Sequence, residues 1–538
     1  MMHYPITTNT ILQHSTSEYS DVEIVSAQNN SDPLIYKYDS FASRVCQLAN
    51  YLTSIGVCAG DRVATLAWNT HQHLELYYAI SGIGAICHTI NPRYSLEQIS
   101  YIVDHAQDTA LFFDLSFVDI AEHLLEKKCC IKHYVRLQPC EDNLPGNKDR
   151  FVDYESMLTG HDLQFEWPNL DEESEAALCY TSGTTGDPKG VAYSHRSIFL
   201  HATFASQRDA LDISSVDTVC PIVPMFHVNA WGIPYIAPMA GATLVLPGSN
   251  LKAAALFELF ETYKVTVTAG VPTILNALLS YMHEIGRKPA SLHTIIIGGA
   301  AASTSMINDF EQNFGLRVLH GWGMTETSPL ATISTPKPIV TATMSIEEQR
   351  AYKVKQGRKL FGVEIKLLDA QGNAVAHDGK SFGNLMIKGA WVVDHYYKDK
   401  HSALDKDGWF DTGDISTIDQ NGYMQIVDRS KDVIKSGGEW ISSVTLENAA
   451  LQHPSIAQAS VIGIADPKWL ERPLMILVSK SDVETPSQKE IQNFLSEKVP
   501  KWWIPEKVIF VDSLPIGATG KVQKNELRAK FIANELIK

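Results

Sequence analysis

One segment of the 538-residue chain combines glycine, hydroxyl and lysine side chains in an order suited to phosphate binding. It is Thr181-Ser182-Gly183-Thr184-Thr185-Gly186-Asp187-Pro188-Lys189-Gly190, and it follows an apolar stretch at 176–180 that is typical of a buried strand. Glycines let successive backbone N–H groups face one anion, while the hydroxyls add donors and Lys189 adds a positive charge. The segment is no G-x-x-x-x-G-K-[ST] loop, because Asp187 and Pro188 follow Gly186. It predicts a polyphosphate-binding loop of another type.

A second candidate for chemistry is Lys521, near the C-terminus. It ends the run Pro515-Ile516-Gly517-Ala518-Thr519-Gly520-Lys521, in which two glycines and a threonine favour an open loop. A lysine on such a loop can reach between two anions, such as a carboxylate and a phosphate, and neutralise their repulsion. A solvated surface lysine is the alternative for this residue taken alone.

Between these two segments lie further glycine-rich, acidic and aromatic motifs. In chain order they are Pro224-Met225-Phe226-His227-Val228-Asn229-Ala230-Trp231, Gly298-Gly299-Ala300, Gly321-Trp322-Gly323-Met324-Thr325-Glu326-Thr327, Thr412-Gly413-Asp414, Asp428-Arg429 and Gly437-Gly438-Glu439. The complete series resembles the AMP-forming adenylate synthetases, which comprise acyl-CoA synthetases, peptide-synthetase adenylation domains and beetle luciferases. The runs FHVNAW (226–231) and SGGEWIS (436–442) place the resemblance nearest the medium- and long-chain fatty-acid–CoA ligases.

The resemblance implies a ligase reaction in two steps. A carboxylic acid first attacks ATP, with Mg²⁺ present, to give an acyl-adenylate and pyrophosphate, and coenzyme A then displaces AMP. The family's catalytic lysine matches Lys521, and its magnesium contacts match Glu326 and Thr181. Asp414 and Arg429 match the groups that bind ribose and phosphate. Without the resemblance, Glu326 would be an ordinary residue at a helix N-terminus, and Asp414 and Arg429 would be turn and surface residues.

The resemblance also implies the rest of the site. Its acid pocket comprises His227, Trp231, Gly298 and Trp322, with His227 separating the acid from the thiol channel and counted as catalytic. Trp231 could equally be a core residue, and Trp322 stands where tyrosine is commoner. The remaining nucleotide-binding residues that the resemblance implies, beyond the loop from Thr181 to Lys189, are Gly299, Ala300, His320, Gly321, Trp322, Gly323, Thr325, Lys435, Gly437, Gly438, Glu439 and Trp440.

The elements that must position these residues follow an α/β pattern. Apolar strands are expected at 62–68, 109–114, 176–180, 243–246, 265–268 and 294–297, with helices between them at 251–263 and 303–314. Asp39 or Ser40 is the expected cap of an earlier helix that ends before Gly56. Continuous apolar strands that alternate with helices predict mostly parallel, doubly wound sheets covered on both faces.

The pattern of apolar runs and turn residues changes after about residue 350. Strand-like runs at 363–368, 384–387 and 423–427 alternate with turn signals, of which Asn421-Gly422 is a strong hairpin signal, so a small β-barrel is expected. A small, mobile α+β domain follows. We therefore expect an N-terminal domain at 1–427 for ATP and acid, a hinge at 428–433 with Lys431 in the family's hinge position, and a C-terminal lid at 434–538 that carries Lys521. A plain surface turn is the alternative for 428–433.

Composition excludes several classes of protein. The 61 acidic and 45 basic residues give a net charge of −16, which argues against a general nucleic-acid binder. The eight cysteines contain no C-x-x-C pair, which favours free thiols in a reducing compartment. No apolar run approaches the ~18–20 residues that span a bilayer, and no secretory or peroxisomal signal is present, so a cytoplasmic protein without a membrane span is expected.

The sequence leaves the acid and some neighbouring functions open. A medium- or long-chain acid is the first expectation, and a short or methylthio-alkanoate acid follows if Trp231 and Trp322 truncate the pocket. The alternatives of other kinds are luciferase-like oxidation, loading of a carrier protein and a regulatory nucleotide binder without catalysis; the intact Lys521, Glu326 and Thr181 argue against the last. Related fatty-acid enzymes are often dimers, so a homodimer is an expectation by analogy only.

Overall fold

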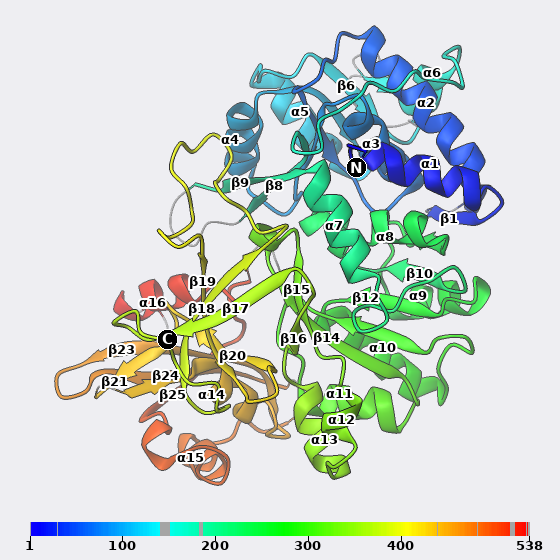
Figure 1. The fold of residues 1–538 in the computed structure, drawn as a ribbon. Coiled ribbons are helices and arrows are strands. Elements are labelled where there is room, and N and C mark those ends of the chain that lie inside the picture. The colour runs from blue at the N-terminus through cyan, green and yellow to red at the C-terminus, as the bar shows by residue number, and fades with distance from the viewer. Residues whose placement is uncertain are drawn as a thin grey trace. The chain divides into compact units, whose positions relative to one another are not determined.

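The computed structural model describes residues 2–28, 31–139, 151–181, 187–437, 439–480, 483–516, 522–533 and 535 (Figure 1). The chain divides into two compact units, and each is described by itself. The larger unit contains Met1–Glu364 and Lys388–Phe410, and the smaller unit contains Ile365–Ile387 and Asp411–Lys538.

A seven-stranded sheet in the larger unit contains the strand that leads into the predicted phosphate loop. The strands pair in the order β7-β6-β5-β3-β4-β8-β9, in parallel except for β8 with β9. They are β3 (Arg62–Leu66), β4 (Ile86–Thr89), β5 (Asp108–Phe113), β6 (His133–Arg136), β7 (Val152–Asp153), β8 (Glu175–Thr181) and β9 (Lys189–Ser194). The central strands are buried almost throughout, which explains why they are continuous apolar runs.

A nine-stranded sheet forms the second layer of the larger unit. Its order is β16-β15-β14-β13-β12-β10-β11-β1-β2, parallel from β14 to β1 and antiparallel at both edges. The strands are β1 (Glu23–Gln28), β2 (Ser31–Lys37), β10 (Thr218–Pro221), β11 (Thr243–Leu246), β12 (Val267–Gly270), β13 (Thr294–Ile297), β14 (Arg317–Gly323), β15 (Leu330–Ile333) and β16 (Arg358–Lys359). The bounds predicted for β11 and β13 are confirmed.

Helices cover both sheets, as the α/β prediction requires. They are α1 (Thr8–Glu18), α2 (Tyr38–Ser54), α3 (His71–Gly82), α4 (Leu96–Ala106), α5 (Val118–Glu126), α6 (Tyr154–Leu158), α7 (His195–Ala205), α8 (Ile233–Ala240), α9 (Ala253–Thr262), α10 (Pro272–Ile285), α11 (Thr304–Gln312), α12 (Pro338–Thr341) and α13 (Ile346–Lys353), with short 3-10 helices η1 (Leu115–Phe117), η3 (Val228–Gly232) and η4 (Thr325–Thr327). Helices α9, α10 and α11 lie beside strands of the nine-stranded sheet (Figure 1). They share a core with that sheet, and Phe260, Met282 and Phe310 belong to this core.

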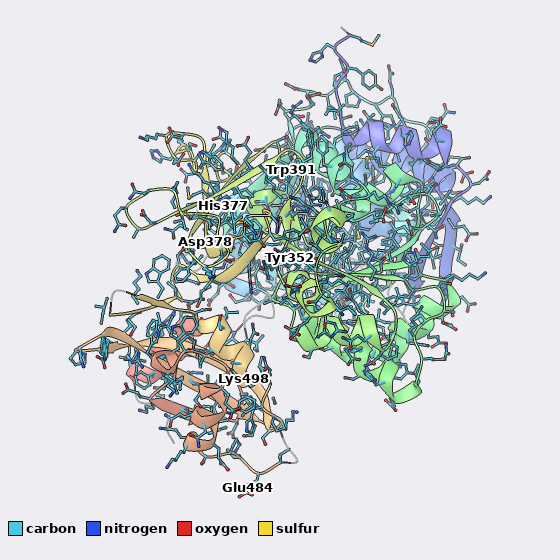
Figure 2. The ribbon with its side chains drawn as sticks, turned by 60° about the horizontal axis from the view of Figure 1, so that its bottom comes forward. Tyr352, His377, Asp378, Trp391, Glu484 and Lys498 are labelled. Carbon is cyan, nitrogen blue, oxygen red and sulfur yellow. The ribbon has the colours of Figure 1, made fainter. Side chains whose placement is uncertain are left out.

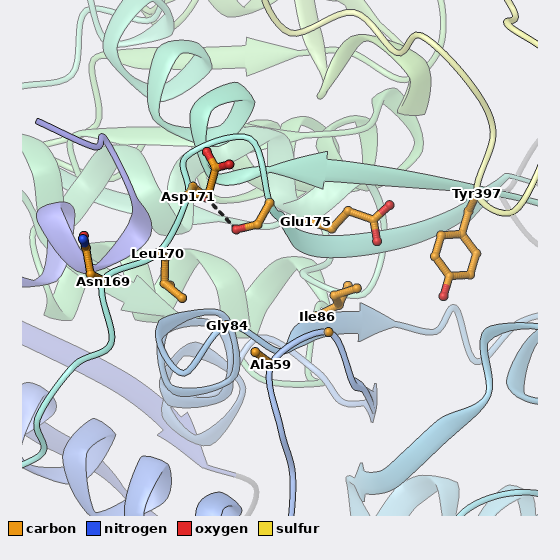
Figure 3. Close-up of a pocket in the computed structure, with 10 residues that line it drawn as sticks. Ala59, Gly84, Ile86, Asn169, Leu170, Asp171, Glu175 and Tyr397 are labelled. Carbon is orange, nitrogen blue, oxygen red and sulfur yellow. Dashed lines mark hydrogen bonds between the residues drawn. The ribbon is translucent and has the colours of Figure 1, made fainter. Parts of the chain in front are cut away.

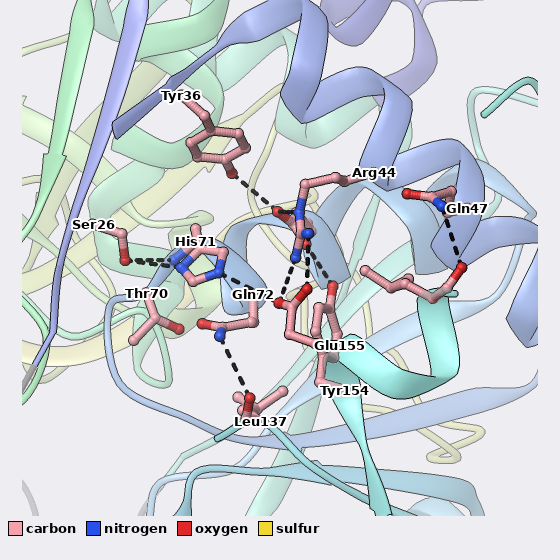
Figure 4. A network of polar contacts seen from close by, with 12 residues as sticks. Ser26, Tyr36, Arg44, Gln47, Thr70, His71, Gln72, Leu137, Tyr154 and Glu155 are labelled. Atoms are coloured by element: carbon pink, nitrogen blue, oxygen red, sulfur yellow. Dashed lines mark hydrogen bonds and ion pairs between the residues drawn. The ribbon is translucent and has the colours of Figure 1, made fainter. Parts of the chain in front are cut away.

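Helix α3 is buried along its whole length although it carries several polar residues. Its Glu75 is fully buried, and the Oε1 atom lies 2.7 Å from Arg44 Nε and 3.1 Å from Tyr36 Oη. Tyr154 Oη donates to Glu75 Oε2 at 2.7 Å, and Arg44 also makes two hydrogen bonds to Glu155 (Figure 4). The buried charge is therefore paired and hydrogen-bonded, as a charge inside a protein must be.

The start of α2 differs from the prediction. The helix begins at Tyr38 with Lys37 as N-cap, and no side chain caps it. Tyr38 is fully buried and its hydroxyl donates to the Ala242 carbonyl at 2.8 Å, so packing fixes the start. Asp39 lies in the first turn, where a carboxylate favours the helix N-terminus. The predicted end holds, since Gly56 has the positive φ of +85° expected just beyond a helix.

Two smaller sheets belong to the C-terminal part of the chain. Strands β17 (Val363–Leu368), β18 (Phe382–Gly389), β19 (Phe410–Ile418) and β20 (Met424–Arg429) pair in that order, and most of their residues belong to the smaller unit. The second sheet contains β21 (Ile434–Ser436), β22 (Glu439–Ile441), β23 (Ile456–Asp466), β24 (Leu470–Ser479) and β25 (Lys507–Phe510), with helices α14 (Ser443–Ala450), α15 (Gln488–Ser496) and α16 (Lys524–Ile532) and the 3-10 helix η5 (Lys501–Trp503). The predicted hairpin at Asn421-Gly422 is confirmed, because it joins antiparallel β19 and β20.

Trp391 illustrates how the segment Lys388–Phe410 joins the larger unit. Its side chain is fully buried, its indole N–H donates to the Leu330 carbonyl at 3.1 Å, and its ring stacks on Phe204 at 5.8 Å (Figure 2). The seven cysteines in the described ranges are free thiols. Within those same ranges, we find no helix with the length and hydropathy needed to cross a membrane.

Candidate active site

The two ends of the predicted phosphate loop are cross-strand neighbours. Thr181 is the last residue of β8 and pairs directly with Lys189, the first residue of β9. The base of the loop is anchored by the connection between β4 and α4, where Tyr94 Oη donates to the Tyr180 carbonyl at 3.1 Å. The hydroxyl of Thr181 and the ammonium group of Lys189 are thus presented at one end of the hairpin. Residues Ser182, Gly183, Thr184, Thr185 and Gly186 lie outside the described residues.

Glu326 is fixed next to this hairpin by a tyrosine that the sequence analysis missed. The residue lies in η4 and is 6% exposed, and its Oε1 accepts a hydrogen bond from Tyr396 Oη at 3.0 Å. Lys189 Nζ stands 4.6 Å from the centre of the Tyr396 ring. Burial, and then the nearby charge of Glu326, raise the pKa of Tyr396, so its hydroxyl remains a donor. Tyr396 therefore links the two candidate groups.

A second tyrosine links the strand after the loop to η4. Tyr193 on β9 is buried, and its hydroxyl donates to the Thr325 carbonyl at 2.7 Å. The Val393 N–H donates to the Glu326 carbonyl at 2.9 Å. Hydrogen bonds therefore hold both the backbone carbonyls of η4 and the side chain of Glu326. The arrangement explains how Thr325 and Glu326 are kept beside β8 and β9.

The oxygen atoms at this place suit a hard cation that is shared with a phosphate. Glu326 contributes a buried carboxylate, and Thr181 contributes a hydroxyl. Within the described residues, no group of three His, Cys, Asp or Glu side chains is arranged to hold a metal ion. Mg²⁺ needs no such cage, since it keeps several waters and commonly takes one or two protein oxygens together with phosphate. The residues present fit that mode of binding.

The predicted adenine segments leave adjacent strands. Ile297 and His320 are partners on parallel β13 and β14, so Gly298-Gly299-Ala300 follows one strand beside Gly321 of the other. His320 is buried, and its Nδ1 lies 2.8 Å from the Val354 carbonyl. Burial lowers the pKa of His320, while hydrogen bonds to the Val354 and Ala300 carbonyls oppose the shift. Through these hydrogen bonds, the His320 ring contacts the backbone at Ala300.

Two glycines of the GWGMTET motif lie close to the chain around β15, and packing requires glycine at Gly323. A Cβ added to Gly323 would lie 1.9 Å from the Pro329 carbonyl oxygen, and one on Gly321 would lie 3.0 Å from Leu330 Cδ1. Their small size therefore serves the contact between β14 and the chain around β15. Trp322 between them is half-buried and faces Thr332 across the strand pair.

His227 and Trp231, both predicted to line the acid pocket, lie at an unusual turn. Val228, Asn229, Ala230 and Trp231 have φ values of +46°, +41°, +46° and +56°, and Gly232 continues with +82°. A left-handed turn of non-glycine residues costs roughly 1–2 kcal/mol for each of them, and such strain gathers at functional sites. The sequence predicted a turn here, but it did not predict that the turn is left-handed.

Trp231 lies against the predicted substrate loop. A Cβ placed on Gly298 would be 2.9 Å from Trp231 Cη2 and 3.3 Å from the Gly321 carbonyl oxygen. The structure therefore places Trp231 beside Gly298, one of its predicted pocket neighbours, and places Gly298 beside the Gly321 carbonyl. His227 precedes the turn, and its N–H donates to the Pro224 carbonyl at 3.1 Å.

Buried polar side chains hold the left-handed turn. Asn229 Oδ1 accepts from Cys179 Sγ at 3.1 Å and from Thr89 Oγ1 at 3.5 Å, and Thr89 also contacts Cys179 at 3.1 Å. All three residues are buried. Since Cys179 precedes Thr181 by two residues on β8, the turn is tied to the strand that leads into the phosphate loop. Sequence reasoning missed Asn229 and Cys179 in this role.

The smaller unit contains the predicted ribose group. Asp414 and Arg429 are cross-strand partners on β19 and β20, with Arg429 Nε 2.7 Å from Asp414 Oδ1. Arg429 Nη1 also donates to the Thr412 carbonyl at 3.3 Å. Asp414 is almost completely buried, whereas the arginine is partly exposed. The pair was predicted from two separate motifs, and the structure shows it as one ion pair.

The hairpin around the Gly437-Gly438 motif lies in the same unit. Lys435 pairs with Trp440 across β21 and β22, and the Trp440 ring stacks on Phe382 at 5.5 Å. Gly437 has φ +62°, and a Cβ there would lie 2.8 Å from Trp469 Cε3, so glycine is required. Gly438, the side chain of Glu439 and the predicted catalytic lysine, Lys521, lie outside the described residues.

Lys431 occupies the predicted hinge segment, and its side chain is exposed. Burial lowers the pKa of Lys431, and the positive charges of Arg429, Arg528 and Lys524 act in the same direction, while Asp432 opposes them. Its carbonyl accepts a hydrogen bond from Arg528 Nη2 at 3.3 Å. The hinge assignment itself stays a prediction.

A separate pocket of about 300 Å³ lies at the other end of β8 (Figure 3). Its lining includes Ala59, Gly84, Leu170, Glu175 and Tyr397. Glu175 is the first residue of β8 and Thr181 is the last, so this pocket is distinct from the candidate site. Burial raises the pKa of Glu175.

Comparison with known families agrees with this geometry. The AMP-binding enzyme family matches residues 12–397, and the AMP-binding enzyme C-terminal domain matches residues 445–521. The first match alone covers more than half of the chain. The protein therefore belongs to the AMP-binding enzyme family, in the branch that contains acyl-CoA ligases.

Individual relatives are similar over nearly their whole length. The chain is 46% identical to the 3-methylmercaptopropionyl-CoA ligase of Ruegeria lacuscaerulensis and 44% identical to that of Ruegeria pomeroyi; each match covers 99% of this chain and 98% of the relative. It is 42% identical to the medium-chain-fatty-acid–CoA ligase of Ectopseudomonas oleovorans, over 99% of this chain and 97% of that protein.

Solved structures share the fold. The anthranilate CoA ligase AuaEII in complex with anthranoyl-AMP superposes with a TM-score of 0.86 at 23% identity, covering 99% of both chains. The o-succinylbenzoate coenzyme A synthetase of Bacillus subtilis, in complex with ATP and magnesium ion, superposes with a TM-score of 0.79 at 23% identity, covering 96% of this chain and 99% of that one. The adenylate-forming fold, with a large N-terminal and a small C-terminal part, is therefore confirmed.

Proposed function

We propose that the protein joins a short carboxylic acid of the 3-(methylthio)propionate class to coenzyme A, with cleavage of ATP to AMP and pyrophosphate. Two relatives named for this acid share 46% and 44% identity with the chain. The observation that carries the choice of a short acid is the Trp231 indole against Gly298. If Gly298 lines the acid pocket, this ring takes the space that a long alkyl chain needs. The proposal reverses the order of the sequence analysis, which put medium- and long-chain acids first.

The first chemical step joins two anions. A carboxylate oxygen of the acid attacks the α-phosphorus of ATP, and the bond from that phosphorus to the oxygen bridging to the β-phosphate breaks, which releases pyrophosphate. Such a step depends on positioning and charge neutralisation. We assign Lys521 to the bridge between carboxylate and α-phosphate and Lys189 to the phosphates. Glu326 and Thr181 would hold Mg²⁺, which neutralises phosphate charge.

Ribose recognition is assigned to Asp414. Its carboxylate can accept hydrogen bonds from the two ribose hydroxyls, and the 2.7 Å contact with Arg429 keeps it charged and oriented. His320 holds the segment around Ala300 from behind, so that Gly299 and Ala300 can approach the base.

The second step transfers the acyl group to sulfur. The thiol of coenzyme A loses its proton, its sulfur attacks the acyl carbonyl carbon, and AMP leaves. We propose that residues 1–427 hold ATP and the acid, that 428–433 form a hinge at Lys431, and that 434–538 move as a lid. Rotation would withdraw Lys521 and bring Gly437 and Gly438 to the pantetheine arm.

A panel of acids tests the proposal. Acids from acetate to palmitate, together with 3-(methylthio)propionate, are assayed for pyrophosphate release and for the CoA thioester. We expect the highest kcat/KM with 3-(methylthio)propionate. Trp231→Ala should raise kcat/KM for octanoate relative to that acid by about 10-fold or more, as added room for apolar groups does in other pockets. Trp167→Phe, a tryptophan beside Gly82, is the matched control and should leave the ratio unchanged.

The same panel identifies the second candidate. A wild-type preference for octanoate would overturn the short-acid proposal in favour of a medium-chain acid, the class named for the relative from Ectopseudomonas oleovorans. Adenylate formation without any CoA thioester would instead support a luciferase-like or carrier-loading enzyme. An unchanged acid profile in Trp231→Ala would remove Trp231 from the pocket.

A further inference from the structure

Helix α16 begins three residues after Lys521 and is clamped by two ion pairs. Lys524 Nζ lies 2.7 Å from Glu447 Oε1 of α14 and 2.5 Å from Ser443 Oγ. One turn later, Arg528 Nη2 lies 2.7 Å from Asp432 Oδ1 and also donates to the Lys431 carbonyl. The helix that follows the lysine loop is thus tied to α14 by one charge and to the hinge segment by the other.

These contacts differ from ordinary surface ion pairs in their burial. The side chains of Lys524 and Glu447 are 12% and 16% exposed, and those of Arg528 and Asp432 are 29% and 10% exposed. Burial alone would lower the pKa of Lys524, but the carboxylates of Glu447 and Asp428 raise it, so the amine stays charged. Glu447 Oε1 also accepts from the Val461 N–H at 2.7 Å. Breaking a pair in such surroundings leaves a poorly solvated charge.

The described residues on either side of the lysine loop are also anchored. Ile516 and Val522 form an antiparallel bridge, and the Gln523 N–H donates to the Pro515 carbonyl at 2.8 Å. Leu527 of α16 is 1% exposed and packs into the core of the C-terminal sheet. Position 522 is therefore held by the bridge, and the direction of α16 is fixed by the packing of Leu527 together with the two ion pairs.

We propose that Arg528 and Lys524 are positioning residues for Lys521. The inference rests on the proposed role of Lys521 in adenylate formation. Without the Arg528–Asp432 pair, α16 keeps its apolar anchor but loses its tie to the segment 428–433. The described helix that follows Lys521 then loses its direct tie to the hinge segment. Displacement of a reacting group by about 1 Å can cost about 10²-fold in rate.

The test separates the two half-reactions. Adenylation is measured as acid-dependent exchange between ATP and pyrophosphate, and thioester formation is measured from supplied acyl-adenylate and coenzyme A. We expect Arg528→Ala to lower kcat for adenylation about 10- to 100-fold, with KM for ATP and acid changed less than about twofold. Thioester formation, which does not use Lys521, should change less than about threefold. Arg528→Lys should recover most of the adenylation rate, because it restores the charge opposite Asp432.

Lys530→Ala is the matched control on the same helix. Lys530 is 42% exposed and, within the described part of the chain, forms its ion pair with Glu526 along the helix, so its loss should leave both half-reactions unchanged. Asp432→Asn removes the same ion pair from the other side and should reproduce the selective loss of adenylation. This variant carries the test if Arg528→Ala does not fold, as judged by thermal unfolding.

Lys521→Ala, assayed in parallel, separates failure of the inference from failure of the proposed function. Normal adenylation by Lys521→Ala would overturn the assigned role of the lysine. Loss of adenylation in Lys521→Ala together with normal adenylation in Arg528→Ala and Asp432→Asn would overturn the positioning role alone. Equal losses of both half-reactions in the Arg528 and Asp432 variants would show a general structural effect and would also overturn it.

Discussion

Tyr396 holds the Glu326 carboxylate in place, and its hydroxyl can be removed without removing its ring. In Tyr396→Phe, the 3.0 Å hydrogen bond to Glu326 is lost while the ring beneath Lys189 stays. Groups that orient a metal ligand typically contribute 10- to 100-fold to metal affinity. We expect the Mg²⁺ concentration for half-maximal adenylation to rise about 10-fold. A Mg²⁺ titration of ATP–pyrophosphate exchange measures it.

The neighbouring residue supplies the control for this experiment. Tyr397 lines the separate pocket and its ring lies 6.1 Å from that of His105 (Figure 3). Tyr397→Phe should therefore leave the Mg²⁺ titration as it is in the wild type. If Tyr396→Phe also leaves it unchanged, Glu326 has no place in the proposed magnesium site.

Motifs located the charged site residues, but they could not supply their partners. Glu326, Asp414 and Arg429 stand in recognisable runs, and the structure places Asp414 and Arg429 in one ion pair. Tyr396 lies 70 positions from Glu326 in the chain, so no local spacing points to it. Asn229 occurs within a recognised run, yet its contact with Cys179 depends on how two distant segments pack.

At the scale of elements, apolar runs predicted strands well because burial on both faces demands them. The strands β11, β13 and β17 have the predicted bounds. The left-handed turn at 228–231 could not be predicted, because Val, Ala and Trp rarely adopt positive φ and only surrounding contacts enforce it. The predicted start of α2 was wrong for a related reason. Burial of Tyr38 fixes the first residue of the helix, although Asp39 and Ser40 are both good capping residues.

The network around Glu75 predicts how three helices depend on one arginine. Arg44→Ala leaves the fully buried Glu75 carboxylate with tyrosine donors and no positive charge (Figure 4). Loss of one partner of a buried pair typically costs about 3–5 kcal/mol. We expect the free energy of unfolding in urea to fall by about that amount. Arg287→Ala, which breaks an exposed pair with Glu261, should cost less than about 1 kcal/mol.

The same network has a contact that responds to acid. Burial opposes ionisation, but hydrogen bonds from His71 and Arg44 hold the pKa of Glu155 at about 2. The contribution of Glu155 to the stability of the folded protein is present above the ordinary glutamate range and is lost as the pH falls towards 2.

Equal urea stability of Arg44→Ala and Arg287→Ala would contradict the arginine prediction. It would mean that the buried charge of Glu75 is balanced by groups other than Arg44.

For the molecule as a whole, the order of the motifs predicted the fold class but not the grouping of the chain. The segment Lys388–Phe410 returns to the larger unit, because Val393 and Tyr397 donate backbone hydrogen bonds to the Glu326 and Gly190 carbonyls. The sheet before it groups mostly with the C-terminal residues. These two contacts join residues 67 and 207 positions apart in the chain, which composition and turn signals do not encode.

Three buried histidines predict how the stability of the whole protein depends on pH. Burial lowers the pKa of His73 and His195 to about 4 and that of His201 to about 3. An unfolded histidine titrates near 6.5. Below that value the unfolded chain binds protons that the folded protein does not, so the stabilisation is complete above about pH 6.5 and declines as the pH falls towards 4. Each histidine contributes a slope of at most ~1.4 kcal/mol per pH unit.

Urea unfolding at about pH 7, 6 and 5 measures this dependence. We expect the free energy of unfolding to fall steadily across the series. His201→Gln, which removes the most strongly shifted of the three groups, should make the decline shallower. His14→Gln, on the exposed face of α1, should leave the slope unchanged although it also removes a histidine. Stability that stays constant from about pH 7 to 5 would mean that these rings are protonated in the folded protein. The hydrogen bond that His201 Nε2 accepts from the Leu330 N–H could not then exist, because a protonated ring has no acceptor to offer.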